Sequence, residues 1–231
     1  MLRKFTIYGE RCSGTHYVEE LIVSNFDATV TWEYGFKHFF GFVNTANSDD
    51  TLFIGVVRDP VKWMNSLHRT PHHICKECKQ STRAFLNKPI YAKPNDWDSK
   101  KYYGPHFKFF GEDRHIYTRK RYANIFEMRH TKLRFLVDDM PKKVKNYILI
   151  RYEDLLDNFE ATMEKIKNAG LIVKPDISFP VNFTQNMSGN SVNKTNPVFD
   201  KNQNNKLSIP TKIIAKHPCF KKKYERLLGY I

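Results

Sequence analysis

The run Thr51–Val57, which reads TLFIGVV, is the sequence feature that most constrains the fold. It has the length of a β-strand and no charged residue, which is typical of a strand buried on both faces of a parallel sheet. An earlier apolar run over residues 4–8 predicts a strand that ends at Gly9, and apolar residues recur at helical spacing from Gly14 onward. These patterns predict a strand, a loop and a helix ahead of a central strand.

The same alternation extends along most of the chain. We expect a short strand at 29–32, a helix from Asp59 and Pro60 onward, a helix at 120–137, a strand at 146–150, a helix at 152–169 and a closing helix with Ile213, Ile214 and Leu227. Alternating strands and helices predict an α/β fold of three layers, in which helices flank a central, mostly parallel β-sheet. We expect one domain over 1–231, with a long excursion at about 70–119 that recognises the substrate.

Charge is the largest deviation from an ordinary composition. The chain has 38 Lys and Arg against 24 Asp and Glu, which gives a net charge of +14. This excess favours anionic ligands such as phosphates, sulfates, nucleic acid or anionic lipid, although a solvated lysine-rich surface would also explain it. The sequence shows neither an apolar run of membrane-spanning length nor a signal peptide, so we expect a cytoplasmic protein with reduced cysteines.

The loop over residues 9–15 has the spacing G-x-x-x-x-G-T between the first strand and the first helix. Backbone amides and a helix N-terminus in such a loop bind phosphate, although a simple capped turn has the same pattern. Thr15 and His16 follow Gly14, where a nucleoside kinase or ATPase would need Lys and then Ser or Thr. In α/β sheets, ligands bind outside the carboxyl ends of the strands, so we expect this loop to be part of the site.

The stretch 11–17, which reads RCSGTHY, resembles the 5′-phosphosulfate loop of sulfotransferases that use 3′-phosphoadenosine 5′-phosphosulfate (PAPS). The common cytosolic form of that loop is Lys-Ser-Gly-Thr-Thr-Trp. The resemblance implies a P-loop-like sulfotransferase fold and a donor-binding loop made of Arg11, Cys12, Ser13, Gly14, Thr15, His16 and Tyr17. Cys12 replaces the family lysine and Tyr17 the family tryptophan. Arg11 and Lys37 are the cations available to replace that lysine.

Three more segments carry the resemblance. Arg58, in the sequence VRDP at the end of the central strand, and Ser66 resemble the family's 3′-phosphate motif, although a surface arginine before a capped helix has the same pattern. The pair formed by Lys37 and His38 is similar to a family Lys-x-His whose histidine is the catalytic base. Tyr152 in IRYEDL resembles a residue that borders the adenine. The resemblance therefore implies that His38, Lys37 and Arg11 are catalytic.

Two other clusters allow different interpretations. His72, His73, Cys75 and Cys78 form a set that is compatible with zinc, although no second Cys or His pair is evident. Lys221, Lys222 and Lys223 and the stretch 114–134 are basic with interleaved aromatic residues, which suits solvated helix faces or a groove for an acidic acceptor. Because sulfonate has a single negative charge, Lys and Arg suffice to bind it, and we expect no metal requirement.

Taken together, the sequence predicts a PAPS-dependent sulfotransferase that acts on a hydroxyl or amine acceptor, with an anionic or carbohydrate acceptor among the candidates. Nucleic acid is not expected to be the partner. Two alternatives stay open at this point. One is a non-enzymatic basic module that binds nucleic acid or sulfated glycan, which the net charge of +14 favours. The other is a degenerate P-loop nucleoside kinase.

Overall fold

Among the residues that the structure describes, four parallel strands form one sheet in the order β2-β1-β3-β4. The structure is a computed structural model, and it describes residues 2–71, 73–91, 113–182 and 209–231. The strands are β1 (Lys4–Gly9), β2 (Thr29–Val30), β3 (Thr51–Val57) and β4 (Tyr147–Arg151). Every residue of β3 is buried, as its apolar sequence predicts, and β3 lies between β1 and β4.

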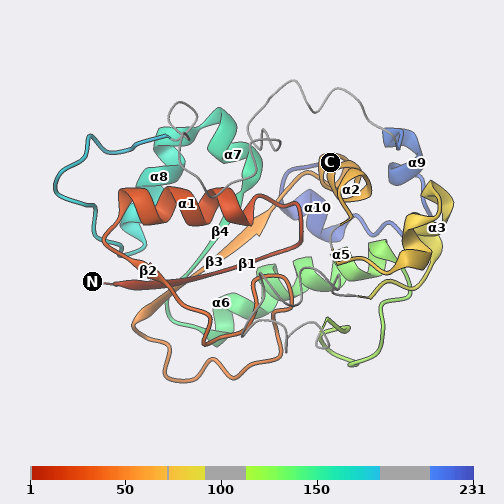
Figure 1. The fold of residues 1–231 in the computed structure, drawn as a ribbon, viewed down its shortest axis with the longest axis horizontal. Helices are drawn as coiled ribbons and strands as arrows, with labels where there is room; N and C mark the ends of the chain where they lie inside the picture. The colour runs from red at the N-terminus through yellow and green to blue at the C-terminus, as the bar shows by residue number, and fades with distance from the viewer. Residues whose placement is uncertain (1, 72, 92–112, 183–208) are drawn as a thin grey trace.

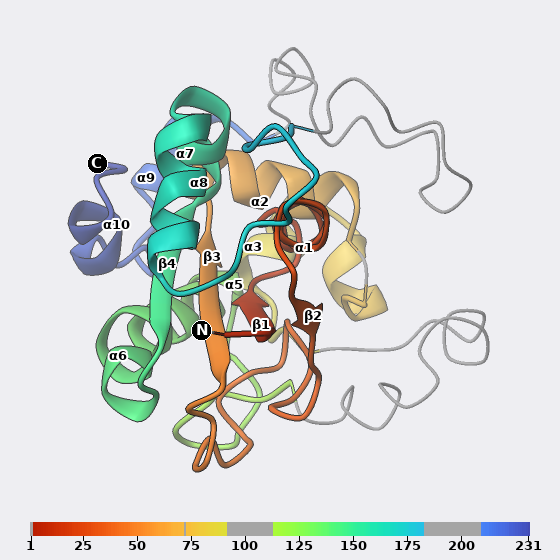
Figure 2. The same ribbon diagram turned by 90° about the vertical axis from the view of Figure 1, so that its left-hand side faces the viewer.

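Helices cover both faces of the sheet (Figures 1 and 2). One layer contains α1 (Thr15–Asn25), α7 (Tyr152–Asp157) and α8 (Phe159–Asn168). The other contains α5 (Ile125–Arg134), the π-helical turn η3 (Phe135–Asp139) and α6 (Met140–Lys143). This arrangement confirms the predicted α/β fold, with a parallel sheet between two layers of helices.

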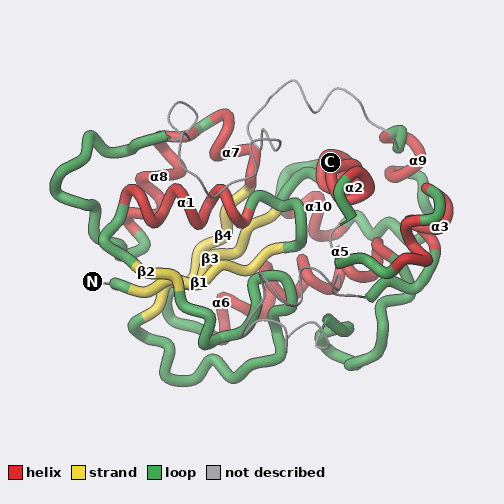
Figure 3. The backbone as a smooth tube through the Cα atoms, in the orientation of Figure 1, coloured by secondary structure: helices red, strands yellow, loops and turns green. Residues whose placement is uncertain are grey.

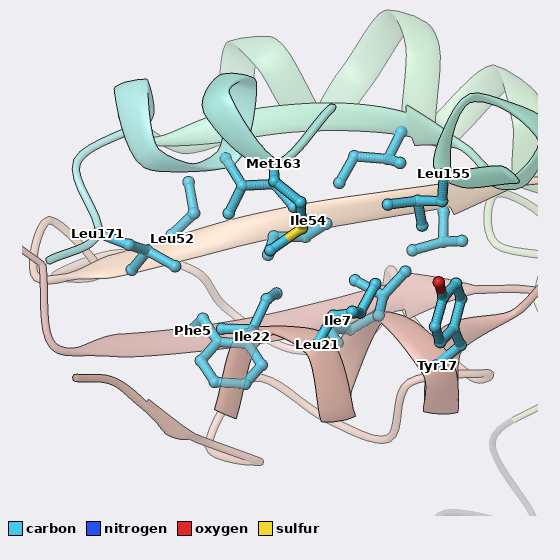
Figure 4. Close-up of a cluster of buried hydrophobic side chains, with 14 of the residues drawn as sticks. Phe5, Ile7, Tyr17, Leu21, Ile22, Leu52, Ile54, Leu155, Met163 and Leu171 are labelled. Atoms are coloured by element: carbon cyan, nitrogen blue, oxygen red, sulfur yellow. The ribbon is translucent and has the colours of Figure 1, made fainter. Parts of the chain in front are cut away.

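The alternation of side chains along the strands produces these two layers. Phe5 and Ile7 of β1 point toward α1, α7 and α8, whereas Tyr8 belongs to the cluster on the opposite face. In β3, Leu52 and Ile54 belong to the first cluster, and Phe53 and Val57 belong to the second cluster. Figure 4 shows the first of these clusters, with side chains from strands and helices packed against each other.

A third buried cluster packs beside the sheet. It combines side chains from α2 (Pro60–Arg69), the short helical turn η1 (Lys76–Lys79), α3 (Thr82–Asn87), α5 and α9 (Thr211–Ala215). The expected excursion at 70–119 is therefore partly regular, because η1 and α3 lie within it. Ser81 starts α3 by accepting a hydrogen bond from the amide of Ala84 (3.1 Å). Residues 92–112 of the excursion lie outside the described residues.

Several predicted boundaries were wrong. The helix expected at 120–137 begins at Ile125, because the side chain of Asn124 caps it by accepting from the amides of Phe126 and Glu127. It then continues through η3 and α6 to Lys143. The strand expected at 29–32 is shorter, since within it only Thr29 and Val30, which form β2, are in register with β1.

The two later helices are also interrupted. The helix expected at 152–169 is two helices, because Asn158 leaves helical geometry (φ −138°, ψ 54°) between α7 and α8. The closing helix is likewise two, α9 and α10 (Lys223–Leu227), which Figure 3 shows as separate helices. No helix within the described ranges has the length and hydrophobicity needed to cross a membrane.

Candidate functional site

The loop between β1 and α1 forms at the carboxyl edge of the sheet, as predicted. The hydroxyl of Ser13 donates to the carbonyl of Glu10 (2.7 Å), and the amide of Ser13 donates to the same oxygen (3.1 Å). These two bonds close a tight turn directly after Gly9. The turn directs the chain into α1, whose first residue, Thr15, is buried.

Gly14 is required at the start of α1. Its φ of 98° lies in the left-handed region, and a Cβ atom there would collide with the ring of Tyr152. As the residue that precedes the helix, Gly14 has no side chain to accept from the amides of the first turn. Those amides, together with the helix dipole, favour an anionic ligand at this end of α1.

Arg58 and Ser66 both lie close to Cys12. Nη1 of Arg58 donates to the carbonyl of Cys12 (3.0 Å), and the side chain of Ser66 acts to lower the pKa of the Cys12 thiol. Burial raises the pKa of Cys12, so this residue is a neutral thiol where the family has a lysine. The Cys12 sulfur also lies 3.7 Å from the hydroxyl of Thr70.

Tyr152 lies between Arg58 and the loop. The guanidinium of Arg58 lies 4.7 Å from the centroid of the Tyr152 ring, which is a cation–π distance. Tyr17 packs edge-on against Tyr152 (6.3 Å between centroids), and its hydroxyl donates to Asn182 (3.2 Å). The Tyr17 ring is therefore part of the buried cluster in Figure 4, and its stacking on adenine stays a prediction.

Lys37 and His16 come together beside α1. Nζ of Lys37 lies 3.2 Å from Nδ1 of His16 and donates to the carboxylate of Glu19 (3.0 Å). Burial lowers the pKa of Lys37, and the ion pair with Glu19 opposes that effect. Lys37 does not directly follow a strand, since β2 ends at Val30. Its carbonyl instead accepts the amide of Gly9 (2.9 Å), which fixes it beside the loop.

His38 is held in a defined orientation beside the loop. Its Nδ1 lies 2.8 Å from the carbonyl of Gly9. A carbonyl only accepts, so Nδ1 carries the proton and Nε2 keeps a lone pair. Burial lowers the pKa of His38 well below its usual value, and the cations Arg11 and Lys37 lower it further. The imidazole is therefore neutral near pH 7.

Arg11 points away from Cys12 and into a buried polar cluster. Its Nη1 pairs with Asp113 (3.3 Å), its Nε donates to Nδ1 of His73 (3.5 Å), and its guanidinium lies 4.6 Å from the centroid of the Phe39 ring. Its Nη2 is buried and has no hydrogen-bond partner among the described residues. A buried donor without a partner is uncommon and often marks a functional position.

Arg129 is a site residue that the sequence did not reveal. It is 2% exposed and donates to both carboxylate oxygens of Glu225, to Glu10 (3.2 Å) and to the carbonyl of Arg58 (2.8 Å). Its guanidinium also lies 4.9 Å from the ring of Trp63, whose indole N–H donates to the carbonyl of Arg11 (2.8 Å). Arg129 therefore connects α5 to both proposed anion-binding segments.

Lys132, one helical turn after Arg129, is a second site residue that the sequence did not reveal. Its Nζ donates to the carbonyl of His38 (2.9 Å) and to Asp113 (3.0 Å). Asp113 therefore bridges Lys132 and Arg11, and all three side chains are buried. Their positions at i and i+3 on a basic helix were the only sequence signal, since the partners are distant in the chain.

The zinc hypothesis gains no support from the described part of the chain. Within it, no group of three or more His, Cys, Asp or Glu side chains has an arrangement that would hold a metal ion. His73 is bonded to Arg11, and His72 lies outside the described residues. Cys75 and Cys78 contact each other instead.

Comparison of the chain with models of known protein families, with curated proteins and with solved structures finds no match.

Proposed function

We propose that this protein is a sulfotransferase that transfers a sulfuryl group from PAPS to a hydroxyl or amine acceptor. The observation that carries the proposal is the hydrogen bond from His38 to the carbonyl of Gly9 (2.8 Å). Through this bond a neutral base lies directly beside a loop suited to anions. A base and an anion-binding loop at one sheet edge are what transfer of an anionic group to a hydroxyl requires.

The residues around the loop fit the donor. The amides at the start of α1 would bind the 5′-phosphosulfate, and the unpartnered Nη2 of Arg11 is a buried donor that suits an anionic oxygen. Arg58 and Ser66, which both lie close to Cys12, would bind the 3′-phosphate. Tyr152 would border the adenine. When bound, PAPS supplies the sulfuryl group and leaves as 3′-phosphoadenosine 5′-phosphate.

His38 would act on the acceptor. Its Nδ1–H bond to Gly9 fixes the tautomer in which Nε2 accepts a proton, and its lowered pKa keeps it in the basic form. The acceptor hydroxyl would lose its proton to Nε2 while its oxygen forms the new bond to sulfur. Lys132 would hold the His38 backbone in position, since its ammonium donates to the His38 carbonyl.

Cations would stabilise the charge that develops on the leaving phosphate. Lys37 and Arg11 are the candidates for the role of the family lysine, because Cys12 is neutral. Lys37 is the stronger candidate, since its ammonium lies beside His16 on the first turn of α1, where the 5′-phosphosulfate would bind. Positioning and electrostatics supply most of the acceleration in loose transfer reactions of this kind.

Calorimetric titration with three ligands tests the proposal. We expect tight binding of 3′-phosphoadenosine 5′-phosphate and much weaker binding of ATP and of a single-stranded oligonucleotide. Preference for ATP would favour the degenerate kinase, and preference for the oligonucleotide would favour the basic binding module. Transfer of radiolabelled sulfate from PAPS to a panel of hydroxyl, amine and carbohydrate acceptors then tests the reaction. Failure of transfer to every acceptor, despite tight donor binding, would leave only a nucleotide-binding function.

A further inference from the structure

Cys75 and Cys78 form a buried pair that the proposed transfer reaction does not use. Their sulfur atoms lie 2.8 Å apart, and both residues are fully buried. The short turn η1 creates this contact, because the amide of Cys78 donates to the carbonyl of Cys75 (3.1 Å). Both thiols also face the carbonyl of Pro89, at 3.7 and 3.4 Å.

The distance between the sulfurs indicates what this pair does. It is shorter than an ordinary contact between two thiols, and a disulfide bond needs a further approach of about 0.8 Å. The other two cysteines have different surroundings, since Cys12 contacts Thr70 and Cys219 packs at the edge of the third cluster. Within the described residues no third ligand completes a metal site around the pair.

We propose that Cys75 and Cys78 are a redox site that forms an intramolecular disulfide by exchange with a small-molecule disulfide such as glutathione disulfide, which reaches the buried pair during local opening of this segment. Cys75 reacts first, as a thiolate whose proton passes to water, and the 2.8 Å contact between the sulfurs places Cys78 to react second. Cys75 attacks one glutathione sulfur and releases the first glutathione as thiolate. Cys78 then loses its proton and attacks the Cys75 sulfur, releasing the second glutathione. The two cysteines are oxidised and glutathione disulfide is reduced to two glutathione molecules.

The site lies next to the polar cluster of the candidate site. His73, two residues before Cys75, accepts a hydrogen bond from Arg11 (3.5 Å). The amide of Cys75 donates to the carbonyl of Tyr91 (3.2 Å), so the pair lies beside the last residue of the described range 73–91. A bond between the sulfurs would stiffen this segment. The inference does not depend on the proposed function, because its test needs neither donor nor acceptor.

Mass spectrometry of the full chain gives a direct test. The folded protein is incubated with glutathione disulfide, quenched with acid, alkylated in denaturant and digested with trypsin. Cleavage after Lys76 separates the two cysteines into different peptides. We expect a product in which the peptide ending at Lys76 is linked to the peptide 77–79, while Cys12 and Cys219 are alkylated. A thiol reductant should reverse the link.

Variants make the result specific. Cys12→Ser should still form the linked product, whereas Cys75→Ser and Cys78→Ser should not. The proposal is overturned if both cysteines of the folded wild type stay alkylatable, if they carry separate glutathiones, or if the link forms only in denaturant. A purified protein that holds one equivalent of zinc and resists oxidation until a chelator is added would also overturn it, and would restore the zinc hypothesis.

Discussion

Arg129 donates a hydrogen bond to the backbone carbonyl of Arg58, with 2.8 Å between Nη2 and the oxygen. Arg58 is the first residue after β3, so this bond fixes the point where the central strand leaves the sheet. The same guanidinium binds Glu10 in the neighbouring loop and Glu225 in α10. One buried side chain thus holds together the two segments proposed to bind the phosphates of the donor.

Replacing Arg129 should strongly destabilise the fold. Arg129→Met leaves the buried carboxylates of Glu10 and Glu225 without their cation, and loss of one partner of a buried ion pair typically costs about 3–5 kcal/mol. Urea unfolding followed by fluorescence measures the loss. Arg83→Met, which removes an exposed arginine from α3, is the matched control and should change the free energy of unfolding by less than about 0.5 kcal/mol. A similarly small change in Arg129→Met would contradict the structural role.

Glu10 should make stability fall as pH rises toward neutrality. Burial raises the pKa of Glu10 from 4.5 to about 7, although Arg129 opposes the shift. Between pH 4.5 and pH 7 the folded state keeps a proton on Glu10 that the unfolded state has lost. The stabilising contribution of Glu10 to the free energy of unfolding is therefore fully present below pH 4.5. This contribution decreases by about 3 kcal/mol as the pH rises to 7.

Comparison with Glu10→Gln isolates this effect. Glutamine does not titrate, so the variant lacks this pH-dependent loss. The free energy of unfolding of Glu10→Gln minus that of the wild type should therefore increase between pH 5 and pH 8. Glu164→Gln, at a half-exposed carboxylate that pairs with Lys167, is the matched control and should not show this trend. Parallel pH curves for Glu10→Gln and the wild type would show that Glu10 does not titrate in this range.

Arg58 should discriminate nucleotides by their 3′-phosphate. Arg58→Ala removes a charge-assisted hydrogen bond and should weaken binding of 3′-phosphoadenosine 5′-phosphate by about 1.5–3 kcal/mol. Binding of adenosine 5′-phosphate, which lacks the 3′-phosphate, should change much less. Lys62→Ala, which removes an exposed charge from α2, the helix that follows Arg58, controls for net charge. Equal losses for both nucleotides would exclude Arg58 as the 3′-phosphate ligand.

The sequence predicted the local features of the fold well. The buried strand Thr51–Val57, the loop 9–15 and the helix that starts at Asp59 all have signals within a few residues. The side chain of Asp59 accepts from the amide of Lys62 (2.8 Å) and so caps the helix that was expected from Asp59 and Pro60 onward. The break at Asn158 had no such signal, because apolar spacing continues across it.

The candidate site was predictable only where its residues follow strands. The proximity of Arg58, Cys12 and Tyr152 follows from parallel strands that end at one edge. In contrast, the sequence did not reveal the buried roles of Arg129, Lys132 and Asp113. Each of them interacts with partners far away in the chain, and its local sequence is that of an ordinary charged surface residue. The contact between Cys75 and Cys78 depends on the geometry of η1, which spacing alone does not distinguish from a metal motif.

His38 should determine the rate of transfer without affecting donor affinity. Removal of a general base typically lowers turnover by about 10²–10⁴-fold, and we expect this loss for His38→Ala. His38→Gln is the sharper variant, because its amide can still donate to the carbonyl of Gly9 but cannot accept the proton. Both variants should bind 3′-phosphoadenosine 5′-phosphate nearly as the wild type does.

The pH profile separates a base from a structural histidine. Burial and the nearby cations lower the pKa of His38 well below 6.5, so the protein without ligand should keep its basic imidazole as the pH falls through 6.5. The acid limb of kcat/KM should therefore lie below that pH, and it should disappear in His38→Gln. Steady-state transfer of radiolabelled sulfate, measured over a range of pH, gives both results. Wild-type turnover in His38→Gln would remove His38 from the reaction and make His16, beside Lys37, the next base to test.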